Sequence, residues 1–120
     1  ATYIAYCFAN SDIIKAGSYT GNGSSDGPFV YTGFRPAWIM VKRTDGTGNW
    51  IVMDSERDTY NVTDALLSAN ESAAESVDDK FDFLSNGFKN RDTGSWNNAS
   101  GGTYIYLAFA ENPFKYANAR

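Results

Sequence analysis

Residues 37–54 read Ala-Trp-Ile-Met-Val-Lys-Arg-Thr-Asp-Gly-Thr-Gly-Asn-Trp-Ile-Val-Met-Asp, and this stretch indicates the fold class most clearly. Two apolar runs flank a glycine-containing loop at residues 45–48, which is typical of a β-hairpin. Both runs are apolar on both faces, as in strands that are covered on both sides. We therefore expect the hairpin to lie in the middle of a sheet, with Trp38 and Trp50 in the core.

The rest of the chain continues the β pattern, with one exception. Short apolar or alternating runs, separated by polar and glycine-rich turns, occupy 2–8, 16–20, 29–31, 81–84, 88–91 and 103–110. About eight such strands predict an all-β fold, and we expect an antiparallel two-layer β-sandwich or jelly roll, lectin-like, with little helix. The exception is 63–77, whose thin apolar content predicts an irregular loop with at most a turn or two of helix, N-capped by Thr63.

Alternation along the strands predicts which side chains form the core. We expect the core to include Ile39, Val41, Ile51, Met53, Phe83, Ile105, Leu107 and Phe109. Cys7 is the only cysteine and lies in an alternating run, so we expect a small buried hydrophobe there.

The strand at the beginning of the chain is repeated at its end. Residues 2–9 match residues 103–110 at five of eight positions. The chain, residues 1–120, has the length of one domain. The repeated strand leaves two interpretations open. Residues 1–10 can pair in this domain's own sheet, or they can be the closing strand of a preceding or neighbouring copy, with 15–113 as the core unit. We expect pairing in the own sheet, beside 103–110, because intramolecular pairing costs no translational freedom.

Composition excludes several functional classes. The chain carries a net charge of −4 without any cluster of Lys or Arg, which argues against a nucleic-acid partner. It has no His and one Cys, so disulfides within the chain and the usual zinc sites are excluded. No apolar run reaches the roughly 18 residues of a membrane span, and we expect no membrane partner.

The acidic residues do not form a convincing catalytic or metal site. Asp54, Glu56 and Asp58 could supply a carboxylate pair for glycoside hydrolysis, but acids at strand ends are common in β-domains. The loops with Asp45 or with Asp26 offer fewer carboxylates than calcium usually requires. We therefore predict a domain that is not an enzyme and has no metal and no cofactor.

Two clusters of aromatic and planar polar side chains predict a sugar-binding surface. One is Trp96, Asn97 and Asn98, and the other is Trp50, Asp54, Arg57, Asp58, Tyr60 and Asn61. Aromatic faces stack on sugar C–H groups, while carboxylate, amide and guanidinium groups bond to hydroxyls. Structural roles are the alternative: Trp96 can instead cover an edge of the core, and an Arg–carboxylate pair within 55–58 can fasten a long loop to the sheet.

Several longer blocks of the sequence resemble a known family. They are 17–24, 26–38, 40–45, 83–89 and 103–114, and they are similar to a poorly characterised domain of phage tail-fibre-like and other virion proteins. In these proteins the domain often stands near the C-terminus, after similar units. The resemblance implies a location in the virion or outside the cell, and it supplies no ligand or catalytic residues.

Together these observations predict a non-catalytic virion domain of the tail-fibre type that helps to recognise a cell-surface glycan during host attachment. The alternative is a structural assembly module of a fibre, capsid decoration or filament, which pairs through its edge strands with other copies of itself or with other virion proteins.

Overall fold

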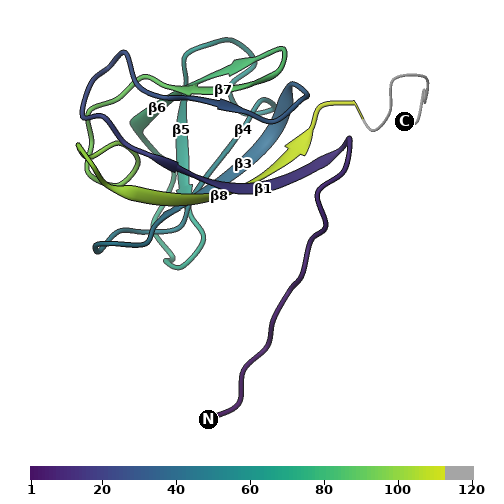
Figure 1. Ribbon diagram of the computed structural model, residues 1–120. Coiled ribbons are helices and arrows are strands. Elements are labelled where there is room, and N and C mark those ends of the chain that lie inside the picture. The colour runs from purple at the N-terminus through teal and green to yellow at the C-terminus, as the bar shows by residue number, and fades with distance from the viewer. Residues whose placement is uncertain (113–120) are drawn as a thin grey trace.

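The computed structural model describes residues 1–112, and these form an all-β, antiparallel fold without a helix (Figure 1). The strands are β1 (Ile14–Thr20), β2 (Phe29–Tyr31), β3 (Pro36–Arg43), β4 (Ile51–Asp54), β5 (Thr63–Ser68), β6 (Ser76–Leu84), β7 (Gly87–Asn90) and β8 (Thr103–Ala110). They form a single sheet in the order β1-β8-β3-β4-β5-β6-β7-β2, which curls until it is nearly closed. The all-β prediction is confirmed, whereas a division into the two layers of a sandwich or jelly roll is not. The described part contains no helix that is long and apolar enough to cross a membrane.

The predicted hairpin is formed by β3 and β4. Val41 pairs with Ile51 and Trp38 with Asp54. Because a curled sheet has one inner face, only alternate residues enter the core, where Ile39, Val41, Ile51 and Met53 are at most 1% exposed. Trp38 lies on the outer face against Phe109, and Trp50 stands outside the strand with 36% of its surface exposed. The expectation that Trp38 and Trp50 lie in the core is therefore wrong.

The side chains of β8 that enter the core lie on the face opposite to the predicted one. Tyr104, Tyr106 and Ala108 are buried, whereas Ile105 is 40% exposed and Leu107 and Phe109 share its outer face. Both alternating sets are apolar enough for a core, so periodicity could not decide between them. The tyrosines can turn inward because their polar ends find partners: the Tyr104 hydroxyl donates to the Ser95 carbonyl and accepts from the Ala99 N–H, both at 2.8 Å.

The segment 63–77 is a strand where we expected a loop with a short helix. Strand β5 pairs with both β4 and β6, and β6 begins at Ser76. Thr63 is 1% exposed inside the sheet and caps no helix. Pairing on both sides satisfies the backbone of β5, so the sheet overrides the weak local preference of its alanines and leucines.

Residues 1–10, called the arm from here on, do not join the sheet. They leave the start of β1 and project away from the body of the molecule (Figure 1). The positions on either side of β8 are taken by β1 and β3, so the expected pairing of the arm beside 103–110 is wrong. Cys7 is exposed and free, which also corrects the expectation of a buried thiol.

Candidate functional site

The loop of residues 92–102 joins β7 to β8 and is held from inside by Asn98. The Nδ2 of this fully buried side chain donates to the carbonyls of Asp92 and Ser24 at 2.7 and 2.8 Å, and its Oδ1 accepts from the Asn22 N–H at 2.9 Å. Asn98 therefore ties this loop to the loop after β1. It has no surface left to offer a sugar.

Asn97 is also fully buried, so it does not belong to the surface of the loop either. Its carbonyl accepts hydrogen bonds from the Tyr19 hydroxyl at 2.7 Å and from Nδ2 of Asn90 at 3.1 Å. Neither polar atom of its side chain has a partner among the described residues. The predicted cluster of Trp96, Asn97 and Asn98 thus reaches the surface through Trp96.

Trp96 lines a hollow of about 180 Å³, called the Trp96 hollow below, together with Asp78, Asp79, Asp92, Gly94 and Ser95. The indole is 39% exposed. A Cβ on Gly94 would lie 2.5 Å from Oδ2 of Asp92 and 3.2 Å from Oδ1 of Asp79. Both carboxyl groups therefore crowd the backbone of Gly94, and no larger residue fits there without a shift.

Asp79 gives the Trp96 hollow its electrostatic character. It is 3% exposed, and its Oδ2 has no hydrogen-bond partner among residues 1–112. Burial raises the pKa of Asp79 to about 7, and the carboxyl groups of Asp92 and Asp78 act in the same direction. No Lys or Arg of the described chain forms an ion pair with these aspartates. The hollow is therefore acidic and has no counter-charge of its own.

In the second predicted cluster, Arg57 links Asp54 at the end of β4 to Glu75, the residue before β6. Its Nε bonds to the Asp54 carboxylate, and its Nη1 lies 2.8 Å from Oε2 of Glu75. Burial alone would raise the pKa of Asp54, but the hydrogen bonds and charge of Arg57 outweigh it and lower that pKa below its usual value. These three side chains fasten the long connections around β5.

The other members of the second cluster are also engaged in structure or stand apart. Oδ2 of Asp58 accepts from the N–H groups of Asp64 and Ala65 at 2.8 and 2.6 Å. The Asn61 amide bonds to both the N–H and the carbonyl of Phe83. Tyr60 is 84% exposed.

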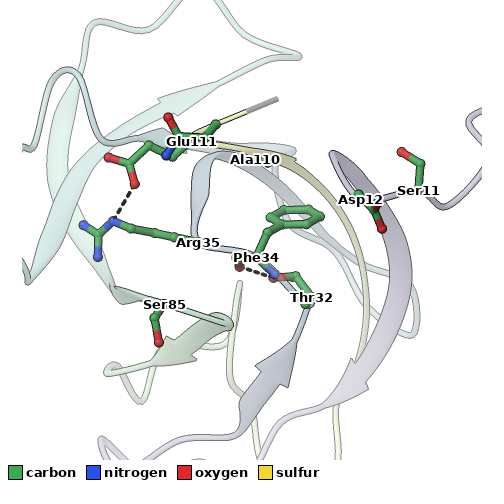
Figure 2. Close-up of a pocket in the computed structure, with 10 residues that line it drawn as sticks. Ser11, Asp12, Thr32, Phe34, Arg35, Ser85, Ala110 and Glu111 are labelled. Atoms are coloured by element: carbon green, nitrogen blue, oxygen red, sulfur yellow. Dashed lines mark hydrogen bonds and ion pairs between the residues drawn. The ribbon is translucent and has the colours of Figure 1, made fainter. Parts of the chain in front are cut away.

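A larger hollow, which the sequence did not predict, has a volume of about 660 Å³ and lies at one end of the gap between the edge strands β1 and β2. Figure 2 shows Arg35 reaching toward Glu111 on one side of it and Asp12 on the opposite side. Arg35 lies 3.4 Å from Glu111 and donates to the Phe83 carbonyl at 2.8 Å. The pairing of Pro36 with Ala110 brings Arg35 and Glu111 together, and only knowledge of that pairing would have predicted the hollow.

The loops considered for calcium are occupied by local interactions. Asp45 pairs with Arg43 at 2.8 Å, and Asp26 pairs with Lys89. Within residues 1–112 no group of three or more Asp, Glu, His or Cys side chains is placed to hold a metal ion.

Comparison with known sequences assigns the chain to a family. A family model matches residues 1–113. The chain belongs to the family described as Domain of unknown function (DUF7483). No curated protein and no solved structure matches it. The matched region of this DUF7483 domain includes the arm, so the arm is part of the sequence that the family model describes.

Proposed function

We propose that this DUF7483 domain is a non-catalytic virion domain of the tail-fibre type that recognises a cell-surface glycan through the Trp96 hollow. The observation that carries the proposal is the partly exposed indole beside three aspartates. A sugar ring can stack its C–H face on Trp96 while its hydroxyls donate to the carboxylates. The volume of about 180 Å³ is below the roughly 300–1,000 Å³ of pockets for drug-sized ligands, so we expect one sugar unit to enter.

The Trp96 hollow is favoured over the larger one because its polar groups are free. In the larger hollow the Arg35 guanidinium is shared between Glu111 and the Phe83 carbonyl, and the Thr32 hydroxyl donates to the Phe34 carbonyl. In the Trp96 hollow, Asp78 is exposed and Asp92 is half-buried, and neither carboxylate forms an ion pair with a Lys or Arg of the described chain. A ligand that donates hydrogen bonds gains most where acceptors are not already satisfied.

The resemblance to virion domains supports the location in this proposal, outside the cell and at host attachment. We also propose that the architecture is a lectin-like one with two layers. The support is that β3 and β4 lie across a shared core from β6 and β7. In that core, Ile39, Val41, Phe81 and Phe83 belong to one buried cluster.

The test is a glycan array probed with the full chain, with Trp96→Ala beside it. We expect Trp96→Ala to weaken binding by about tenfold or more, which corresponds to about 1.4 kcal/mol, while the melting temperature stays unchanged. Trp50→Ala is the matched control, since Trp50 has a similar exposure of 36% and lies outside the hollow. Absence of binding at millimolar sugar would contradict glycan recognition, and release of reducing sugar would contradict the non-catalytic part.

The arm favours a second candidate function, that of an assembly module in a fibre or filament. Tyr3, Ile4 and Tyr6 are 88, 79 and 83% exposed, although the arm matches the interior strand β8 at five of eight positions. An extended apolar segment with unpaired backbone groups readily pairs with another chain. Light scattering over a range of protein concentrations tests this function, and a monomer at every concentration would contradict it.

A further inference from the structure

The arm has an anchored part and a free part. The anchored part lies next to β1: Phe8 packs edge-on against Phe109 with ring centroids 6.0 Å apart, and Oδ1 of Asn10 accepts from the Ala16 N–H at 2.7 Å. The free part, residues 1–7, forms no hydrogen bond with the described chain. It is therefore a strand-like segment without a partner.

The free part carries the sequence of a strand that pairs with β1. Strand β8 pairs with β1 in antiparallel register, with Tyr104 opposite Tyr19 and Thr103 opposite Thr20. The arm repeats the side chains of β8 at Thr2, Tyr3, Ile4, Phe8 and Ala9. Cross-strand side-chain pairs stabilise a sheet, so a copy of β8 is suited to a strand such as β1.

The second edge of β1 is partly open. The N–H of Ala16, which bonds to Asn10, points away from β8, and backbone groups alternate along an antiparallel strand. The even-numbered residues of β1 therefore face this second edge. Asn10 and Ser11 cover Ala16 and Ile14, whereas no described residue bonds to the backbone N–H or carbonyl of Ser18 and Thr20 on this side.

We infer that the free arm of one copy adds as an antiparallel strand to the open edge of β1, at Ser18 and Thr20, in a second copy. Because Tyr19 packs inward against Tyr104, the neighbouring side chains of Ser18 and Thr20 lie on the outer face, where both are exposed and can meet Ile4 and Tyr6 of the incoming strand. This contact rests on the assembly function proposed above. Its two surfaces are the free arm of one copy and the open edge of β1 in another. Because arm and edge are different surfaces, each copy can give one strand and receive one, which builds open chains or closed rings.

A pair of introduced thiols provides a direct test. Side chains alternate between the two faces of a strand, so Cys7 points to the face opposite Ile4, Tyr6 and Ser18. The test variant therefore carries Cys7→Ala, Tyr6→Cys and Ser18→Cys, which places both thiols on the outer face. Under mild oxidation we expect disulfide-linked dimers and higher multimers, at about ten times or more the yield of the same variant with Ser72→Cys in place of Ser18→Cys, since Ser72 is exposed and lies outside the contact. The variant that combines Cys7→Ala with Ser18→Cys lacks the arm thiol, and we expect it to lose these multimers.

A second measurement does not depend on a disulfide. The combined change Ile4→Asp and Tyr6→Asp places two charges in the strand, and we expect it to weaken self-association by about tenfold or more in light scattering. Tyr60→Asp is the matched control, since Tyr60 is similarly exposed at 84% but lies far from the arm in sequence.

The possible outcomes separate this contact from the assembly function. If the chain assembles but the arm variant assembles equally well, or Ser72→Cys cross-links as strongly as Ser18→Cys, the arm–β1 contact is overturned and assembly stands. A disulfide that joins the two introduced thiols within one chain would show that the arm folds onto its own β1, and this also overturns the contact. A monomer at all concentrations overturns both.

Discussion

At the scale of single residues, Asp79 links stability to pH. Its pKa of about 7 lies above the value of an unfolded Asp, so the fold favours the protonated carboxyl. The stability that this preference contributes is complete below about pH 4 and is lost as the pH rises through about 7. Relative to the parent, Asp79→Asn should therefore be more stable at pH 8 by about 1–3 kcal/mol and nearly unchanged at pH 4. Urea unfolding at the two pH values measures this, with the exposed Asp12→Asn as control. An equal effect of Asp79→Asn at both pH values would contradict it.

Also at this scale, the sequence predicted the chemical types around the 92–102 loop but not their roles. Trp96 is 39% exposed, whereas Asn97 and Asn98 are fully buried. Two of the partners of Asn98, Asn22 and Ser24, lie more than seventy residues away. A polar residue in a glycine-rich loop looks the same whether it meets solvent or a distant loop, so only the folded chain distinguishes the two.

At the scale of elements, substitutions on the inner face of β8 should lower stability more than substitutions on its outer face. Tyr106 is 7% exposed in the core, so Tyr106→Ala should cost about 3–5 kcal/mol. Ile105, on the outer face, is 40% exposed, and Ile105→Ala should cost less than about 1 kcal/mol. Chemical denaturation of the two variants compares the faces directly. The reverse order of the two losses would mean that the side chains of β8 point the other way.

The strands themselves were largely predictable, because apolar runs between glycine-rich turns mark them. The hairpin of β3 and β4, the strand β8 and the core positions Ile39, Val41, Ile51, Met53 and Phe83 are confirmed. Strand β5 and the face of β8 were not predictable, since both depend on which strand lies alongside. The larger hollow between β1 and β2 was missed for the same reason.

At the scale of the whole molecule, aromatic side chains join the two edges of the sheet. No backbone hydrogen bond links β1 to β2 within the described chain. Tyr19 of β1 stacks on Tyr104 at 5.0 Å and meets Phe88 of β7 edge-on at 6.1 Å, while Phe88 also meets Tyr106 at 5.2 Å. Phe88 pairs with Val30 of β2, so these rings connect the two sides of the gap.

Tyr19 should therefore contribute more to stability than its place in an edge strand implies. Tyr19→Ala removes the ring contacts and the hydroxyl that donates to the Asn97 carbonyl, and we expect a loss of about 3–5 kcal/mol in the free energy of unfolding. The control is Tyr31→Ala in the other edge strand, where the side chain is 63% exposed and a change within about 0.5 kcal/mol is expected. Urea denaturation followed by tryptophan fluorescence measures both variants. If the two losses were equal, the rings would not be what holds the sheet closed.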